Sequence, residues 1–329
     1  MRCAPKIFWF YIFLTAIIIA SWGSLWFNVH DNWKLFGVGI LAFVLGLKHA
    51  LDVDHIVAID NVTRKLMADQ KQPLGVGFYF SLGHSTAVFL MAVILIAFSK
   101  LGLRYFNLGY LKHWGMIWGT LISASFLFLI ALMNVRVIQK LRTIDIQQEK
   151  SFDHIIPEGF LSRGFNKIYT KISKSSQMYF IGILFGLGFD TTTELVLMAI
   201  TVSVDMKNNS GWMALTLLLL FSSGMILIDS TDGIAMASMY NWAFANPIKK
   251  YYYNFAMTGI SILFAVMVGT LEIFQVIAVK CGFHQIIGQQ LLQVSFSKLG
   301  MISIAFFAFI WVFFIGIVYK RNPKQKAVY

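Results

Sequence analysis

Long apolar runs separated by short polar segments dominate this sequence. A helix that crosses a membrane needs about 20 consecutive, mostly apolar residues. On that rule the chain contains eight spanning helices, at about residues 7–27, 35–58, 74–98, 114–136, 179–204, 212–239, 252–279 and 298–319. The pattern predicts an all-α polytopic membrane protein in which residues 1–329 form a single transmembrane domain.

The composition supports this fold class. Hydrophobic residues make up 58% of the chain and charged residues only 13%, whereas about 25% of a soluble domain is charged. The net charge of +12 does not indicate a nucleic-acid partner, because the basic residues lie in short segments between the apolar runs. The expected partner of the apolar surfaces is the lipid bilayer.

The distribution of Lys and Arg predicts the orientation in the membrane. With the N-terminus inside, 19 of the 27 basic residues fall on the inner side and seven on the outer side. Short cytoplasmic segments carry the excess of Lys and Arg in membrane proteins. Both termini are therefore expected in the cytoplasm, and an odd number of helices would destroy this bias.

The longest inner segment spans residues 137–178. Apolar residues such as Phe165, Ile168 and Ile172 recur there near helical spacing, with basic residues among them. This arrangement predicts a short basic amphipathic helix lying on the inner leaflet. A solvated linker without regular structure is the equally weighted alternative.

Four of the predicted helices carry ionisable residues at membrane depth. No proline or loop-forming cluster separates the apolar run 35–47 from K-H-A-L-D-V-D-H-I at 48–56, so one helix is expected to continue through both. Ionisable groups are costly at this depth, and they therefore indicate a function. The candidate residues are His49, Asp52, Asp54 and His55 in helix 35–58, His84 in helix 74–98, Asp190 and Glu194 in helix 179–204, and Asp229 and Asp232 in helix 212–239.

These residue types predict a site for a divalent metal ion. Six carboxylates that face one another in a low dielectric repel strongly unless a cation or protons neutralise them. Imidazole nitrogen suits nickel, cobalt, copper and zinc, whereas oxygen ligands alone suit magnesium or calcium. Three histidines in the set favour a transition metal, and the two distant cysteines, Cys3 and Cys281, do not indicate thiolate ligands.

Structural roles are the alternative for some of these residues. Taken alone, a histidine such as His84 is more often a hydrogen-bonded packing residue than a metal ligand. Asp190 and Asp229 also fit a role as partners of threonine and backbone groups. The position of His84 in a helix matched by an internal repeat favours ligation.

That internal repeat is weak but consistent. Leu45-Gly46-Leu47 resembles Phe185-Gly186-Leu187, and F-S-L-G at 80–83 resembles F-S-S-G at 221–224, with nearly the same spacing between the copies. The spacing covers three helices, and an odd number of crossings inverts the second copy. The sequence therefore predicts an inverted repeat that relates helices 2 and 3 of the predicted eight to helices 5 and 6. Inverted repeats with polar sites at their interface are typical of secondary transporters.

Four motifs give the chain a resemblance to the nickel/cobalt transporter (NiCoT) family. They are H-A-L-D-V-D-H-I at 49–56, S-L-G-H-S-T at 81–86, L-G-F-D-T-T-T-E at 187–194 and G-M-I-L-I-D-S-T-D-G at 224–233. Val53 is the one departure, because the family has a small alanine there. The resemblance implies uptake of Ni²⁺, in some members Co²⁺, through the bacterial plasma membrane, with the metal as substrate and no cofactor. It also implies that transport depends on His49, Asp54 and His55.

These observations predict a secondary transporter and not an enzyme. The chain contains no G-x-x-x-x-G-K-[ST] motif for ATP, so uptake must draw on gradients or a partner, and a potential of 100 mV supplies about 4.6 kcal/mol for a divalent ion. Two alternatives stay open. An efflux permease of similar architecture often has a His-rich cytosolic segment, and an intramembrane metalloenzyme usually shows H-E-x-x-H; this sequence has neither.

Overall fold

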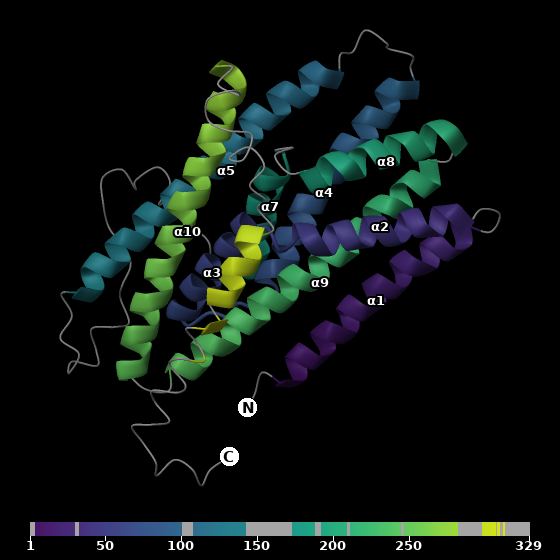
Figure 1. The fold of residues 1–329 in the computed structure, drawn as a ribbon. Coiled ribbons are helices and arrows are strands. Elements are labelled where there is room, and N and C mark those ends of the chain that lie inside the picture. Colours follow the sequence, from purple (N-terminus) through teal and green to yellow (C-terminus); the bar gives the residue numbers. More distant parts are fainter. Residues whose placement is uncertain are drawn as a thin grey trace.

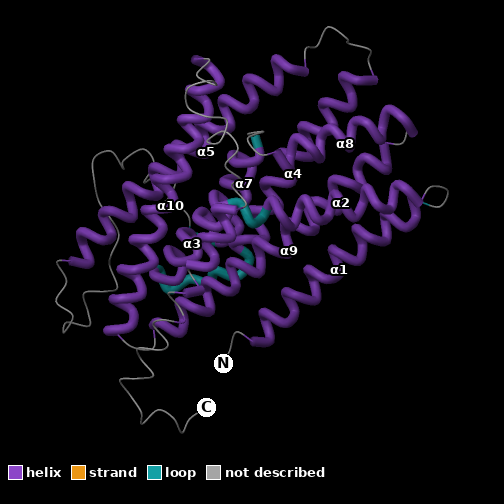
Figure 2. Tube along the Cα trace, in the orientation of Figure 1, coloured by secondary structure: helices purple, strands orange, loops and turns teal. Residues whose placement is uncertain are grey.

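The structure is a computed structural model, and it describes residues 4–29, 33–100, 108–142, 173–187, 192–208, 211–244, 247–281, 298–306, 308–309 and 312. Every regular element within these residues is a helix (Figures 1 and 2). The helices are α1 (Ala4–Asn28), α2 (Trp33–His49), α3 (Val53–Ala68), α4 (Val76–Lys100), α5 (Leu108–Arg142), the 3₁₀ turn η2 (Ser175–Gln177), α7 (Met178–Gly186), α8 (Thr192–Asn208), α9 (Gly211–Phe244) and α10 (Pro247–Cys281). Residues 298–306 are also helical.

The helices confirm the predicted class of an all-α polytopic membrane protein. Within the described residues, α1, α4, α5, α9 and α10 each contain a stretch long and apolar enough to cross a membrane. The pair α2 and α3 meets the same criterion together and makes a sixth candidate. The total of eight stays a prediction, because residues 188–191 and most of 307–319 lie outside the described residues.

The central helix of the fold is α9. It contacts α1, α2, α3, α4 and α8, and α4 in turn packs along α7. Figure 1 shows α1 on one flank of the molecule and the long pair α5 and α10 side by side on the other. The helices that carry the candidate residues therefore meet in the middle, shielded on both flanks.

Two helix crossings in this centre require glycine. A Cβ at Gly46 of α2 would collide with the backbone carbonyl of Phe221 in α9. A Cβ at Gly182 of α7 would collide in the same way with the carbonyl of Phe80 in α4. The internal repeat matches Phe80 with Phe221, so each copy of that phenylalanine lies at a backbone contact with a glycine of the other half. The repeat matches Gly46 with Gly186 and not with Gly182, so the two contacts are not equivalent, and the inverted repeat stays a prediction.

The expectation of one continuous helix across 35–58 is wrong. Helix α2 ends at His49 and α3 begins at Val53, with the two axes bent by 54°. After His49 the backbone forms a tighter turn with hydrogen bonds between residues three apart. Leu51 N–H donates to the carbonyl of Lys48, and Asp52 N–H donates to the carbonyl of His49. Asp52 then adopts an extended conformation as the N-cap of α3. The Asp52 side chain makes no capping hydrogen bond to the first turn of α3 and contacts His49 Nδ1 instead.

Gly300 of the C-terminal helical segment lies against this break. A Cβ there would collide with the carbonyl of Leu51 and approach Ile56. We expect Gly300→Ala to destabilise the protein by about 1–3 kcal/mol, the usual effect of overpacking. The measurement is the unfolding midpoint of the purified protein in detergent.

The control for this substitution is Gly259→Ala in α10. A Cβ at Gly259 meets only Ile138 Cδ1 at 3.9 Å, which is an ordinary contact. Alanine favours a helix over glycine by about 1 kcal/mol, so this variant should be neutral or slightly more stable. Equal midpoints for the two variants would contradict the role assigned to Gly300.

The structure covers only the ends of the long inner segment. Helix α5 continues as far as Arg142, and the chain is described again from residue 173, just before η2 and α7. Ser175 of η2 donates a hydrogen bond to the carbonyl of Gln72 at 3.1 Å. Most of the segment 137–178, for which the sequence predicts a basic amphipathic helix, lies outside the described residues.

Candidate metal site

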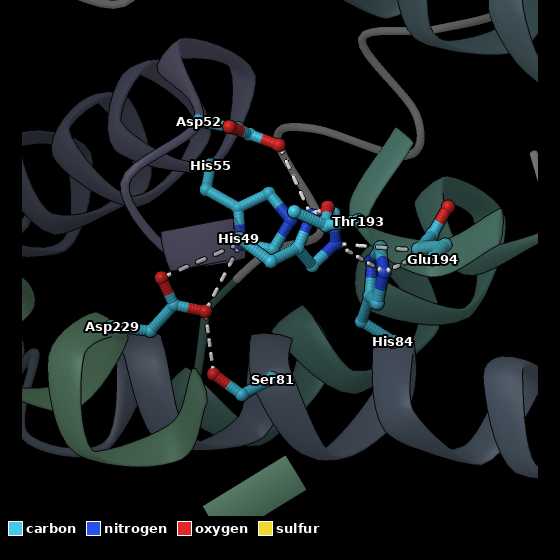
Figure 3. Close-up of polar contacts among 8 residues, drawn as sticks. All are labelled: His49, Asp52, His55, Ser81, His84, Thr193, Glu194 and Asp229. Carbon is cyan, nitrogen blue, oxygen red and sulfur yellow. Dashed lines mark hydrogen bonds and ion pairs between the residues drawn. The ribbon is translucent and has the colours of Figure 1, made fainter. Parts of the chain in front are cut away.

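Three histidines from three helices converge at the centre of the fold. His49 is the last residue of α2, His55 lies in the first turn of α3, and His84 lies in the middle of α4. One ring nitrogen of each lies within 4.8 Å of the others, and all three side chains are buried. Figure 3 shows the three rings turned toward one another. The break between α2 and α3 makes this possible, because it redirects the chain between His49 and His55.

A carboxylate completes a compact group of ligand atoms. His49 Nε2 lies 2.9 Å from His84 Nε2, and Glu194 Oε1 lies 2.7 Å from His84 Nε2 and 3.6 Å from His49 Nε2. Two ligand atoms that each lie about 2.1 Å from one ion are about 3 Å apart when they subtend a right angle. The three atoms therefore have the spacing of neighbouring ligands around a single ion.

Hydrogen bonds alone do not satisfy this group. A ring nitrogen carries at most one proton, so His84 Nε2 donates either to Glu194 or to His49. If it donates to Glu194, it has no lone pair left to accept a bond from His49. A cation between the three atoms satisfies all of them at once.

The opposite nitrogen of two of these rings is anchored. His49 Nδ1 lies 3.0 Å from Asp52 Oδ2 and 3.2 Å from Thr193 Oγ1. His55 Nδ1 lies 3.1 Å from Asp229 Oδ2, which also accepts a hydrogen bond from the Ser81 hydroxyl at 2.6 Å. Metal-binding histidines commonly show this arrangement, in which a carboxylate holds one nitrogen and leaves the other for the ion.

Three buried polar atoms around the rings have no hydrogen-bond partner within the part of the chain that the structure describes. They are His55 Nε2, His84 Nδ1 and Glu194 Oε2. An unsatisfied polar atom at such depth costs about 1–3 kcal/mol, and proteins rarely leave one without a purpose. His55 Nε2 is the nitrogen that the Asp229 contact leaves available, so its lack of a partner fits a ligand position.

Six of the nine candidate residues come together in this centre: His49, Asp52, His55, His84, Glu194 and Asp229. Asp54 is buried next to them, and its Oδ1 has no hydrogen-bond partner. Asp232 lies one turn beyond Asp229 on α9, within electrostatic reach of Asp229 and Asp60. Asp190 lies outside the described residues.

Three buried features near the centre were not predicted from the sequence. Thr193, which contacts His49, was one of three consecutive threonines with nothing to distinguish it. Arg64 of α3 forms a buried ion pair with Asp60 at 2.8 Å and donates to Ser261 of α10 at 2.7 Å. Glu272 of α10 is buried and accepts a hydrogen bond from Ser123 of α5 at 3.0 Å. Apart from the Asp60–Arg64 pair, which lies within α3, these contacts join residues from different helices, and helical periodicity does not detect such contacts.

Comparisons with known proteins point to one family. The sequence profile of the family described as "High-affinity nickel-transport protein" (NicO) matches residues 35–317. The chain is 40% identical over 304 residues to "Nickel transporter NixA" of Staphylococcus aureus, covering 89% of this chain and 88% of that protein. It is 39% identical over 339 residues to "High-affinity nickel transport protein" of Cupriavidus necator, covering 99% and 95%.

A cobalt transporter is among the relatives as well. The chain is 32% identical over 253 residues to "Cobalt transport protein NhlF" of Rhodococcus rhodochrous, covering 74% of this chain and 72% of that protein. No solved structure matches the chain. The profile match over most of the sequence, together with these relatives, confirms the resemblance carried by the four motifs. The chain belongs to the NicO family of high-affinity nickel-transport proteins.

Proposed function

We propose that this protein takes up Ni²⁺, and Co²⁺ as a second substrate, across the bacterial plasma membrane. The observation that carries the proposal is the convergence of His49, His84 and Glu194, whose ligand atoms have the spacing of neighbours around one ion. The relatives named as nickel transporters and the one named as a cobalt transporter support the choice of substrate.

The proposed ligands are the three histidines and Glu194. His49 Nε2, His84 Nε2 and Glu194 Oε1 already face a common point, and the buried His55 Nε2 has no hydrogen-bond partner among the described residues. Asp52 and Asp229 act through the rings, because each holds the Nδ1 of one histidine. A mixed set of imidazole nitrogen and carboxylate oxygen suits Ni²⁺ and Co²⁺ better than Mg²⁺ or Ca²⁺.

The fold supports alternating access around this centre. The ligands come from α2, α3, α4 and α8, so an ion held between them ties together four separate helices. Discontinuous helices that meet at a repeat interface are common in secondary transporters. In the proposed orientation both termini are cytoplasmic and residues 1–329 act as one transporter domain. The inside-negative potential then favours inward movement by about 4.6 kcal/mol per divalent ion at 100 mV.

Accumulation of ⁶³Ni²⁺ in cells that lack their own nickel permease tests this function. Expression of the chain should raise cellular ⁶³Ni²⁺, and excess unlabelled Co²⁺ should reduce the signal more than Zn²⁺ or Mn²⁺ does. Collapse of the membrane potential should lower the initial rate. A fall in cellular nickel on expression would reverse the direction and identify an efflux permease. No change in either direction would refute transport.

A further inference from the structure

A second buried polar network surrounds Arg64 in the C-terminal half of α3. Its members come from α3, α5 and α10, and none of them is more than 8% exposed. We refer to it as the Arg64 network, and it consists of Asp60, Asn61, Arg64, Asn134, Thr258 and Ser261. It lies at a different level of α3 from the histidine centre, because Arg64 follows His55 by nine residues, or about 13 Å along the helix axis.

Arg64 ties α3 to α10 through directional bonds. Its Nη1 donates to the Thr258 hydroxyl at 2.9 Å, and its Nη2 donates to the Ser261 hydroxyl at 2.7 Å. Ser261 donates to Asp60 Oδ2 at 3.0 Å, and the same oxygen lies 2.8 Å from Arg64 Nη2. Bonds from a charged guanidinium are stronger than bonds between neutral groups. The network therefore holds this half of α3 against α10, its neighbour in Figure 1.

Asn61 extends the network to α5. Its Oδ1 accepts hydrogen bonds from Arg64 Nη2 at 3.0 Å and from Asn134 Nδ2 of α5 at 2.7 Å. Asn134 lies near the C-terminal end of the span Ile117–Gln139. In the orientation proposed above, that end faces the cytoplasm, and α3 runs from the histidine centre toward the same side. The network then closes the interface of α3, α5 and α10 between the centre and the cytoplasm.

The opposite face of α3 is apolar. Val62 lies two residues from both Asp60 and Arg64, and two residues of a helix turn by about 200°. Val62 packs in an apolar cluster with Phe80 of α4 and Met178 of α7. A divalent ion that left the centre along this face would lose its ligands without replacement, at a high cost in free energy. The interface with α5 and α10 is therefore the route that offers oxygen ligands on the cytoplasmic side of the centre.

Arg64 blocks a cation in that interface. Its guanidinium is permanently charged, and a fixed positive charge in a narrow pathway repels cations. It also occupies the oxygens that an ion would use, namely Asp60 Oδ2 and the Ser261 hydroxyl. Asp60 Oδ1 is buried and has no hydrogen-bond partner among the described residues. Movement of Arg64 would remove the barrier and leave the Asp60 carboxylate available to an ion.

A stabilising clamp does not need these charges. Replacement of a buried ion pair by well-packed apolar residues of similar volume is often neutral or even stabilising. The apolar cluster on the other face of α3 shows that this helix is also held by packing without charge. The charge of Arg64, and not only its bonds, is therefore what needs an explanation.

We propose that Arg64 is the inner gate of the transporter. In this structure its bonds are made, so the gate is closed and separates the histidine centre from the cytoplasm. Release of the ion requires the guanidinium to leave Asp60 and Ser261, whose freed oxygens then pass the ion toward the cytoplasm. This inference rests on the proposed function and orientation.

Thiol labelling from the cytoplasmic side tests the gate. Cys3 and Cys281 are replaced by serine, and one new cysteine is introduced as Val57→Cys or Val62→Cys. Both valines are 0% exposed. Val57 lies between His55 and the network and packs in an apolar cluster with residues of α5 and α10, whereas Val62 faces α4 and α7. Inside-out membrane vesicles are treated with a membrane-impermeant maleimide, and the labelled fraction is followed over time.

We expect Val57→Cys to react slowly when Arg64 is present and about tenfold faster or more in Arg64→Gln, because glutamine cannot replace the bonds of the charged group. Val62→Cys should react equally slowly in both backgrounds. Ni²⁺ binding to purified Arg64→Gln, measured by equilibrium dialysis, should match the wild type. Accumulation of ⁶³Ni²⁺ by cells should fall, because the centre then stays open to the cytoplasm.

Ser261→Ala provides a second variant if Arg64→Gln does not reach the membrane. It keeps the pair of Asp60 and Arg64 and removes one acceptor on α10. The labelling of Val57→Cys should rise in this background too, by a smaller factor than in Arg64→Gln.

Equal labelling of Val57→Cys with and without these substitutions would overturn the inference. So would faster labelling of Val57→Cys and Val62→Cys alike, or loss of Ni²⁺ binding in Arg64→Gln, since either result would indicate a general structural role. All of these outcomes leave nickel uptake by the wild type intact. Failure of the proposed function would appear as a lack of ⁶³Ni²⁺ accumulation by the wild type itself, so the two failures are distinguishable.

Discussion

Replacing His49 by alanine is expected to abolish nickel accumulation while the protein remains in the membrane. His49 contributes its Nε2 to the group formed with His84 and Glu194, and its ring carries the contacts to Asp52 and Thr193. Loss of groups that merely orient a ligand costs about 10- to 100-fold in metal affinity, so loss of a ligand should cost more than about 100-fold. His84→Ala should have the same effect, because His84 Nε2 lies between the other two atoms.

The measurement is ⁶³Ni²⁺ accumulation at micromolar nickel, with the abundance of each variant in isolated membranes determined in parallel. Leu90→Ala on the same helix is the matched control, because the Leu90 side chain is 55% exposed and lies outside the centre. That variant should accumulate nickel close to the wild-type level. Normal accumulation by His49→Ala would remove His49 from the site and with it the proposed centre.

A bulky residue at Gly46 is expected to prevent folding, which is the second large effect. A Cβ at this position would overlap the carbonyl of Phe221, and backbone atoms on both sides leave no flexible side chain to move. Gly46→Val would force α2 away from α9, the helix against which it packs most extensively. Overpacking of this kind costs about 3 kcal/mol or more, and the valine side chain adds two methyl groups to the overlap.

The expected result is loss of the protein from the membrane, measured by blotting and by gel filtration in detergent. Gly37→Val on the same helix is the control, because a Cβ at Gly37 has no atom within 4 Å. Gly37→Val changes the helix propensity by the same amount as Gly46→Val, so it controls for that effect. It should remain abundant in the membrane. Equal abundance of the two variants would show that the crossing of α2 and α9 is looser than the structure indicates.

Much of the architecture could be read from the order of apolar and polar residues. The spans that correspond to α1, α4, α5, α9 and α10 are long and uniformly apolar, and each is found close to its expected position. These helices form because a lipid environment leaves a backbone no other way to satisfy its hydrogen bonds. The chemistry of the centre was also accessible, because buried histidines and carboxylates have few purposes in a membrane other than binding or transferring ions.

The helix break at residues 50–52 could not be predicted from the order of apolar and polar residues. Apolar runs and the absence of proline predict continuity, yet the chain turns between His49 and Val53. The turn is stable because tertiary contacts support it: Gly300 packs against the carbonyl of Leu51, and the carboxylate of Asp52 binds His49. The contact between Asp52 and His49 is local, but Gly300 lies about 250 residues away in the sequence, so its packing against the turn is not visible within the segment itself.

By itself, the sequence determined that this is a polytopic helical membrane protein, and it indicated which ionisable residues gather in the buried centre, because burial of charge in lipid is so costly that its positions carry information. Only the tertiary structure decided which ring nitrogen of each histidine stays available. His49 and His55 present Nε2 because Asp52 and Asp229 occupy the other nitrogen of each ring, and Asp229 comes from a helix more than 170 residues downstream. The same structure shows that Glu272 is buried beside Ser123, a contact between two helices that no local pattern encodes. Side-chain direction depends on how distant helices cross, and that geometry exists only once the chain has folded.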